Sequence, residues 1–406
     1  MTKKKLFINF LLVLAFIYPC AADDGLLSSS TGTPVAGSDI SASTESAVFP
    51  KLLWEKKLSK PITSSAISKD GTKIAIADET GYLTLYDTKG KKLWAYRYYG
   101  ELPKRTLEFQ SDKSDTIFFD VKFSGGGKYI IADLRVLNTW TDFRGFGKTE
   151  EYEPYIKIFL DKDGKLLWQT LKEGRHFIGG DEYVLIQSWS GDESDTNPLD
   201  YYLLDTRGQL LFTGKTNGDS LRCYGFSEDG RYLFLDNKII ECKSGRSVWE
   251  IKSGLFEGIN KNHAVVVNKG GGEVYNFTTR TKLLNIRNTS FFSITNKHIA
   301  GIQSEQGKVF LTVHEIETGR LVWRRQSYPE PTPGGDERLL YLTKDSMRLF
   351  LGGVKSLILY NSHGGEIWRL PVIIKPNGNF DYYSLTENGE FVLFGYDRAV
   401  RLYKSF

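Results

Sequence analysis

Cysteine and histidine are scarce, with three Cys and five His in 406 residues. No CxxC, HxH or HExxH spacing occurs, so the usual metal-binding motifs are absent. No GxSxG elbow, Walker loop or GxGxxG after a strand occurs either. We therefore expect no catalytic residues, no metal ligands and no cofactor, and we expect the protein not to be an enzyme.

Long apolar runs and an excess of one charge are also missing. No stretch of 18 or more apolar residues exists, which excludes an ordinary membrane-spanning helix. The 53 Lys and Arg are nearly balanced by 49 Asp and Glu, for a net charge of +4. A near-neutral chain lacks the basic footprint of nucleic-acid binding.

The N-terminus has the pattern of an export signal. Lys3–Lys5 precede the short apolar run 6–18, and small residues lead to a cleavage position after Ala22. We expect a signal peptide over 1–22, a disordered Ser/Thr/Gly-rich linker over 23–48, and an exported protein, periplasmic or extracellular. The alternative is acylation of Cys20 and anchoring to a membrane, which the linker favours and the preceding Tyr-Pro pair disfavours.

One short strand pattern recurs eight times after a Gly-containing or polar turn. In six copies it ends in Trp, and in the other two Phe212 and Leu284 take that place. The tryptophans are Trp54, Trp94, Trp168, Trp249, Trp323 and Trp368. A position repeated once per unit serves packing between units, so we predict docking residues here.

A second series gives the same period of about 45 residues. Segments such as 65–78, 120–133 and 223–236 each read as strand, tight turn, strand, which is a hairpin pattern. With the strand that follows and the Trp strand, four antiparallel strands, A to D, recur. Eight A-B-C triplets can be counted, and the missing last D strand is found at 51–58. We predict an all-β, eight-bladed β-propeller over 49–406, closed by this N-terminal strand; seven blades is the alternative.

The repeats FLDKDGKLLW, HEIETGRLVW and LYNSHGGEIW resemble those of quinoprotein-like (PQQ-type) propellers, and the A–B hairpins resemble WD40-like repeats. The resemblance covers 49–406 and implies the fold. It does not select a function, because propellers host enzymes, scaffolds and binding modules.

Two cysteines, Cys223 and Cys242, follow the predicted signal. The repeat places them on strands A and C of one blade, about two strand spacings apart and beyond disulfide reach. We predict two buried, unpaired thiols.

Long insertions fall where B–C and D–A connections lie, at one end of the blades. The two B–C insertions, Leu134–Pro154 and Ser188–Leu199, hold the only tryptophans outside the repeat position. Insertions confined to one face mark the binding face of a repeat protein, and exposed Trp and Arg are typical interface anchors. The predicted binding residues are Trp140, Phe143, Arg144, Tyr152 and Trp189; the alternative is that these loops pack on each other.

These features favour an exported, non-enzymatic scaffold or binding protein. Its partner is expected to be a protein or a carbohydrate, not a nucleic acid, with a membrane involved only if Cys20 is acylated. A lipid-anchored envelope assembly factor, like the outer-membrane propeller lipoproteins, and a quinoprotein-type oxidoreductase are the alternatives.

Overall fold

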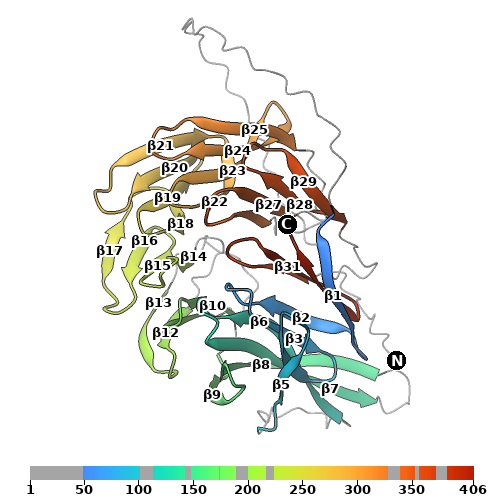
Figure 1. Ribbon diagram of the computed structural model, residues 1–406. Helices are drawn as coiled ribbons and strands as arrows, with labels where there is room; N and C mark the ends of the chain where they lie inside the picture. Colours follow the sequence, from blue (N-terminus) through green and yellow to red (C-terminus); the bar gives the residue numbers. More distant parts are fainter. Residues whose placement is uncertain are drawn as a thin grey trace, which may run out of the picture.

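A computed structural model describes residues 49–100, 113–141, 148–172, 174–188, 200–215, 224–327, 339–352, 356–371 and 382–406. The residues predicted as signal peptide and linker lie outside these ranges. Within these ranges thirty-two strands form eight four-stranded sheets. The sheets are arranged around a ring (Figure 1). Among the described residues no helix is long and apolar enough to cross a membrane.

Blades one to seven each consist of antiparallel strands A, B, C and D in chain order, and blade eight takes its D strand from the N-terminal side of the chain. The A strands of blades one to eight are β2 (Ile62–Ile67), β6 (Lys113–Phe123), β10 (Arg175–Gly179), β14 (Tyr224–Phe226), β18 (Leu255–Ile259), β22 (Thr289–Ile294), β26 (Leu339–Leu342) and β30 (Tyr382–Leu385). The B strands are β3 (Lys73–Asp78), β7 (Tyr129–Thr141), β11 (Tyr183–Gln187), β15 (Tyr232–Leu235), β19 (His263–Asn268), β23 (His298–Glu305), β27 (Arg348–Gly352) and β31 (Phe391–Tyr396).

The C strands are β4 (Tyr82–Asp87), β8 (Lys148–Asp161), β12 (Asp200–Asp205), β16 (Lys238–Glu241), β20 (Gly271–Asn276), β24 (Lys308–Glu315), β28 (Ser356–Asn361) and β32 (Ala399–Lys404). The D strands are β5 (Lys92–Arg97), β9 (Leu166–Thr170), β13 (Leu210–Lys215), β17 (Ser247–Glu250), β21 (Lys282–Arg287), β25 (Leu321–Ser327), β29 (Glu366–Pro371) and, for blade eight, β1 (Lys51–Lys57). In most pairs of neighbouring blades the A strands contact each other, so these strands lie nearest the ring axis.

The N-terminal strand closes the ring, as predicted. β1 pairs antiparallel with β32, from Lys51 opposite Lys404 to Lys57 opposite Ala399. Arg401 Nε donates to Glu55 Oε2 at 2.8 Å across this pair. Blade eight is therefore built from both ends of the described chain, and the alternative of seven blades is wrong.

Every D strand carries a β-bulge at the residue immediately before the Trp position. The partner register skips one residue there in all eight blades. The skipped residues are Leu53, Leu93, Leu167, Leu211, Val248, Leu283, Val322 and Ile367. A bulge reverses the alternation of side chains along a strand, so it turns the Trp to the neighbouring blade.

The repeat tryptophans contact the C–D turn of the next blade. Trp168 Nε1 donates to the Thr206 carbonyl at 3.0 Å. Gly208 in that turn has φ of +78°, and a Cβ added there would lie 2.8 Å from the Trp168 ring. Trp94 makes the same pair of contacts with Lys162 and Gly164. The Trp of one blade thus packs on the turn glycine of the next blade, and this contact recurs between blades.

The two ends of the ring differ. We call the end with the A–B and C–D turns the turn end, and the end with the B–C and D–A connections the insertion end. At the turn end, Lys344 Nζ of blade seven lies 2.6 Å from Glu228 Oε1 of blade four. These blades are three places apart in the ring, so this ion pair braces the ring across its axis.

The structure corrects the predicted boundaries of the first B–C insertion. Most of Leu134–Pro154 is not loop: β7 continues to Thr141 and β8 begins at Lys148. Only 142–147 lies between them. Cys242 is buried and unpaired, as predicted, while Cys223 lies outside the described residues.

Candidate functional site at the insertion end of blades two and three

A long hairpin extends blade two at the insertion end. Its strands β7 and β8 have 13 and 14 residues, whereas the B and C strands of blade one have 6 each. They stay paired as far as Thr141 opposite Lys148. The adjacent A strand β6 follows them with 11 residues and pairs Lys113 with Thr139. Blade two therefore has a sheet that extends beyond the height of blade one.

The hairpin carries two of the five predicted binding residues. Trp140 lies opposite Thr149, and Tyr152 opposite Leu137. Their strand positions are described, but their side chains are not. Phe143, Arg144 and Trp189 lie outside the described residues, so the predicted binding site remains a prediction.

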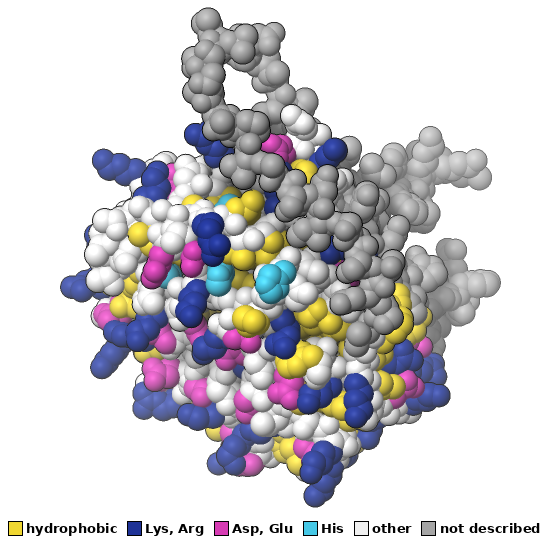
Figure 2. Space-filling model, turned by 45° about the horizontal axis from the view of Figure 1, so that its top comes forward, with side chains coloured by type: hydrophobic (Ala, Val, Ile, Leu, Met, Phe, Trp, Pro, Cys, Tyr) yellow, Lys and Arg dark blue, Asp and Glu magenta, His cyan; other side chains and the backbone are white. Residues whose placement is uncertain are grey.

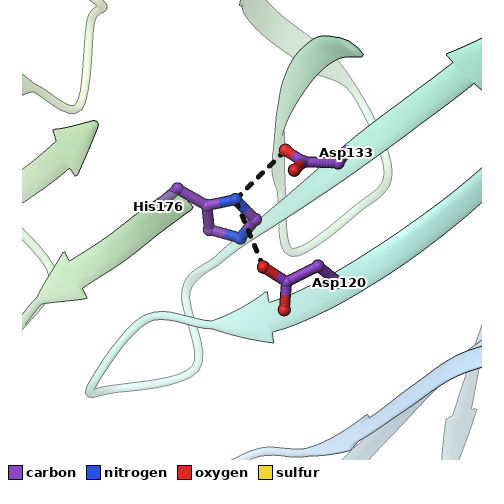
Figure 3. A group of neighbouring side chains, drawn as sticks. All are labelled: Asp120, Asp133 and His176. Atoms are coloured by element: carbon purple, nitrogen blue, oxygen red, sulfur yellow. Dashed lines mark hydrogen bonds and ion pairs between the residues drawn. The ribbon is translucent and has the colours of Figure 1, made fainter. Parts of the chain in front are cut away.

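Below the hairpin lies a buried polar cluster between blades two and three (Figure 3). Asp120 comes from β6, Asp133 from β7 and His176 from β10. Lys157 of β8 joins them, and its Nζ lies 2.7 Å from Asp133 Oδ1 and 2.6 Å from the Gly174 carbonyl oxygen. Neither Lys157 nor His176 has an exposed side chain.

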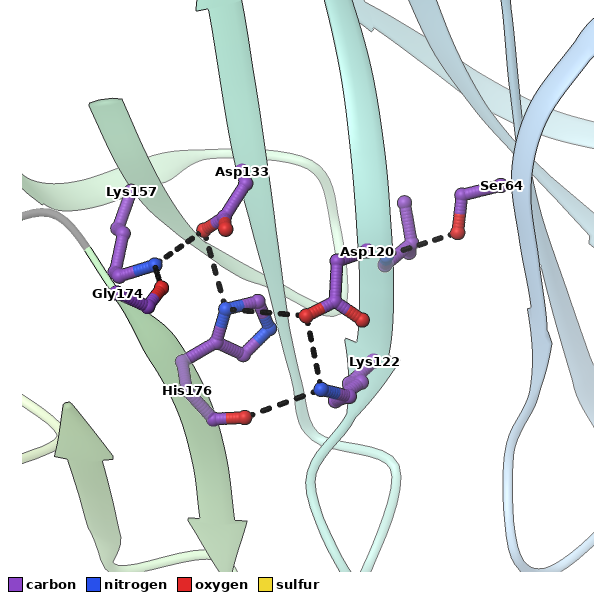
Figure 4. A network of polar contacts seen from close by, with 8 residues as sticks. Ser64, Asp120, Lys122, Asp133, Lys157, Gly174 and His176 are labelled. Carbon is purple, nitrogen blue, oxygen red and sulfur yellow. Dashed lines mark hydrogen bonds and ion pairs between the residues drawn. The ribbon is translucent and has the colours of Figure 1, made fainter. Parts of the chain in front are cut away.

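Asp120 is the member of the cluster that reaches solvent, with 37% of its side chain exposed. It has φ of +46° and lies at a bulge where β6 loses register with β7. The next amide, of Val121, donates to Ser64 Oγ of blade one at 3.0 Å (Figure 4). Bulges re-aim side chains, and this one turns Asp120 toward His176 and Lys122.

The His176 ring is held by carboxylates on one nitrogen. Nδ1 lies 3.1 Å from Asp133 Oδ1 and 3.7 Å from Asp120 Oδ2. Burial lowers the pKa of His176, so the ring is neutral at pH 7 and Nδ1–H donates to Asp133. Nε2 then has no hydrogen-bond partner among the described residues.

The remaining charged groups of the cluster are two carboxylates and two ammonium groups, whose charges balance. Burial would raise the pKa of Asp120, but the charge that His176 carries in its protonated form, together with the Lys122 ammonium, outweighs burial and holds that pKa below its usual value. Burial lowers the pKa of Lys157, an effect that Asp133 opposes. Lys122 Nζ binds Asp120 Oδ2 at 2.9 Å and the His176 carbonyl at 3.1 Å. Two carboxylates thus face two ammonium groups around a neutral imidazole.

Two carboxylates and an imidazole are the donor types that Zn²⁺ and related ions accept. Here, however, the Lys157 ammonium already occupies Asp133 Oδ1. A metal ion would have to displace that buried cation or add its charge to it. The arrangement therefore suits fastening blade two to blade three below the hairpin better than holding a metal.

Spacing rules could not find this cluster. Asp120, Asp133, Lys157 and His176 are separated by 13, 24 and 19 residues, and no linear motif joins them. One signal was present in the repeat: Lys157 interrupts the apolar run YIKIFL of a C strand. A charge at a buried strand position implies a buried partner.

No family description matches the chain, and no curated protein matches it. Among solved structures, BamB from Moraxella catarrhalis superposes with a TM-score of 0.55 at 13% identity, over 88% of this chain and 100% of that one. A structure titled U3-55K gives a TM-score of 0.45 at 11% identity, over 88% of this chain and 100% of that one, too loose a match to support any inference. At such identities the likeness concerns the fold alone, and 1142 solved chains share it to some degree, so it does not select a function. By its repeats and its eight four-stranded blades the chain is an eight-bladed β-propeller, and its likeness to the BamB structure is one of fold.

Proposed function

We propose that the protein is an exported, non-catalytic binding protein that holds a protein partner against the hairpin of blade two. The observation that carries this proposal is the hairpin itself, a sheet extension that closure of the ring does not require. Lengthened connections on one face of a repeat protein are the usual place for binding.

The polar cluster supports this proposal because it fixes the base of the hairpin. Asp133 and Lys157 lie on its two strands, and both are tied to blade three through His176 and Gly174. A binding element on a rigid base loses less conformational entropy when a partner docks.

The test is site-specific photocrosslinking in cells. A photoreactive residue at 140 or 152 should capture the same partner protein, and the matched position Lys89 in a C–D turn should not. A variant in which 137–152 is replaced by a two-residue turn should melt like the parent and lose the product. Equal products from all three positions would place binding elsewhere; retention on a glycan without any protein product would indicate a carbohydrate ligand.

The second candidate is an envelope assembly factor anchored through an acylated Cys20. Cys20 and the segment 23–48 favour it. Mass spectrometry of the N-terminal peptide separates the two candidates, because acylation adds a fatty-acid mass and cleavage after Ala22 removes Cys20. A stoichiometric red-shifted chromophore after addition of PQQ would overturn the non-catalytic proposal.

A further inference from the structure

Blades two and three are joined by titratable groups at two levels. At the turn end, Asp181 of blade three accepts hydrogen bonds from Ser124 Oγ at 2.6 Å and from the Gly126 amide at 2.8 Å. Lys128 Nζ lies 3.3 Å from the other oxygen of the same carboxylate. Farther toward the insertion end, the polar cluster around His176 joins the same two blades. The two levels involve different titratable groups, so they respond to pH separately.

His176 is the member of the polar cluster whose ordinary pKa lies closest to neutral pH. Its side chain has no exposed surface, whereas other histidine side chains reach the surface of the face drawn in Figure 2. Burial lowers the pKa of His176, and the hydrogen bond with Asp133 opposes this effect. Because burial prevails, the folded protein holds the imidazole neutral at a pH at which a hydrated histidine takes up a proton.

The charged groups that face this imidazole come from three strands of blade two. β6 contributes Asp120 and Lys122, as Figure 4 shows. β7 contributes Asp133, and β8 contributes Lys157. On the other side, the neighbouring strand β11 of blade three places the apolar Ile186 opposite the histidine. Two carboxylates thus already face two ammonium groups, and a proton on the imidazole would be a third positive charge with no carboxylate to balance it.

An unbalanced charge costs less in water than in a buried site. The state in which the cluster opens to water therefore takes up the proton more readily than the closed state. The pKa of His176 in the closed state lies below its ordinary value of 6.5, so the stability that the neutral ring gives the closed state is fully present above pH 6.5. It is lost as the pH falls below that value toward the closed-state pKa.

The contacts of Asp181 at the turn end do not titrate in this range. Burial would raise the pKa of Asp181, but its hydrogen bonds with Ser124 and Gly126 outweigh burial and hold that pKa below its usual value of 3.8. Asp181 thus stays charged at pH 5, and its contacts with blade two remain. Opening of the polar cluster leaves the two blades hinged at the turn end.

We propose that proton uptake by His176 is a pH switch that loosens blade three from the base of the hairpin. At neutral pH the cluster holds Asp133 and Lys157, one on each strand of the hairpin. In the opened state these strands lose that support, and the local free energy of opening falls. The consequence for a partner, weaker binding in mild acid, rests on the proposed function; the switch itself rests only on the contacts between the two blades.

The test is hydrogen–deuterium exchange at pH 7.5 and 5.5, with each rate divided by that of an unstructured chain at the same pH. We expect exchange in β7, β8 and β10 to become roughly tenfold faster at pH 5.5, because each opening takes up one proton below pH 6.5. β31 and β32 of blade eight contain no histidine and should change less than about twofold. Equal acceleration in blade eight, or none in blade two, would overturn the proposal.

Two substitutions separate titration from packing. His176→Asn keeps an N–H group for Asp133 but takes up no proton, so the acceleration should fall below about twofold. Lys122→Met keeps the imidazole and leaves two carboxylates against one ammonium, so the closed state accommodates the proton and the acceleration should fall too. The matched control is His363→Asn, which replaces an exposed histidine of blade seven and should retain the roughly tenfold difference.

Because Lys122 is partly exposed, Lys122→Met decides the question if His176→Asn does not fold. An acceleration that stays unchanged in Lys122→Met, or in a folded His176→Asn, would overturn the switch. Melting curves at pH 7.5 identify the folded variants. The exchange measurement requires no partner protein, so failure of the switch and failure of photocrosslinking at the hairpin are separate results.

Discussion

Lys157 is the single residue on which the polar cluster most depends. Its ammonium is fully buried and is paired with Asp133 and the Gly174 carbonyl. Removing one partner of a buried pair leaves an uncompensated charge, which costs more than the pair contributes. The cluster should therefore tolerate removal of both partners better than removal of one.

We predict that Lys157→Met lowers the free energy of unfolding by about 3–5 kcal/mol. Adding Asp133→Asn to it should recover part of that loss, because the orphaned carboxylate is gone. The matched control is Lys165→Met, an exposed lysine on the same blade, which should change little. Urea unfolding of the four proteins gives the answer, and a double variant no better than Lys157→Met would contradict the pairing.

Glu257 on β18 is a half-buried carboxyl group, and its Oε1 accepts a hydrogen bond from the Phe292 amide at 3.2 Å. Burial raises its pKa to about 7, an effect that the Phe292 amide opposes. Because this folded pKa is above the unfolded value near 4.5, its contribution is fully present below pH 4.5 and is lost as pH rises through 7.

Glu257→Gln should therefore stabilise the protein at pH 8, by on the order of 2 kcal/mol, and change nothing at pH 4. Gln keeps an oxygen for the Phe292 amide and adds no charge. Thermal melts at the two pH values, with the exposed Glu79→Gln as control, measure the difference. A Gln variant less stable at pH 8 would show that the carboxylate is needed there.

At the scale of the element, the D strand of one blade and the C–D turn of the next blade form one structural unit. The bulge turns the Trp toward the next blade, and the glycine in the C–D turn of that blade leaves room for the Trp ring. The repeated letters predicted the docking position, because a residue kept in every unit packs between units. They could not predict the bulge, since a two-for-one pairing leaves the apolar pattern unchanged.

Gly208→Ala tests this contact between the Trp ring and the turn glycine. An added Cβ would lie 2.8 Å from Trp168 at a φ of +78°, so we expect a loss of about 2–3 kcal/mol from clash and strain together. Gly307→Ala is the control, because it has φ of +73° with nothing within 4 Å and isolates the strain alone. Equal shifts in the melting temperature for both would mean that the Trp contact does not require glycine.

The hairpin shows where prediction from the sequence stops. The sequence shows that 134–154 is longer than the corresponding segment of the other repeats. It does not show the strand pairing, because the residues of β7 and β8 between Leu134 and Ile156 mix Thr, Asn, Glu and aromatic residues without strict alternation. The cluster at its base was missed for a different reason. Its four side chains come from three neighbouring strands of blade two and the first strand of blade three, and no linear motif indicates which side chains meet between two blades.

At the scale of the whole molecule, stability depends on closing a ring from repeating units. A propeller without its last strand exposes the edge of β32, and an open edge invites pairing with other chains. β1 supplies the missing hydrogen bonds, the Arg401–Glu55 ion pair, and Trp54, whose Nε1 donates to the Thr88 carbonyl of blade one at 2.8 Å. One short strand therefore joins blade eight to blade one as well as completing blade eight.

Deleting residues 1–58 should accordingly cause aggregation or a large loss of thermal stability, whereas deleting 1–48 should not. Both proteins lack the same N-terminal segment, and only the first lacks β1, so the difference isolates ring closure. A synthetic peptide of residues 49–60 should restore the first protein in trans, since an open edge accepts an added strand. Light scattering and thermal melts follow both effects. If the two truncated proteins melt alike, β1 is dispensable; if the peptide restores nothing, the loss arises from the removed connection to β2 and not from the open edge.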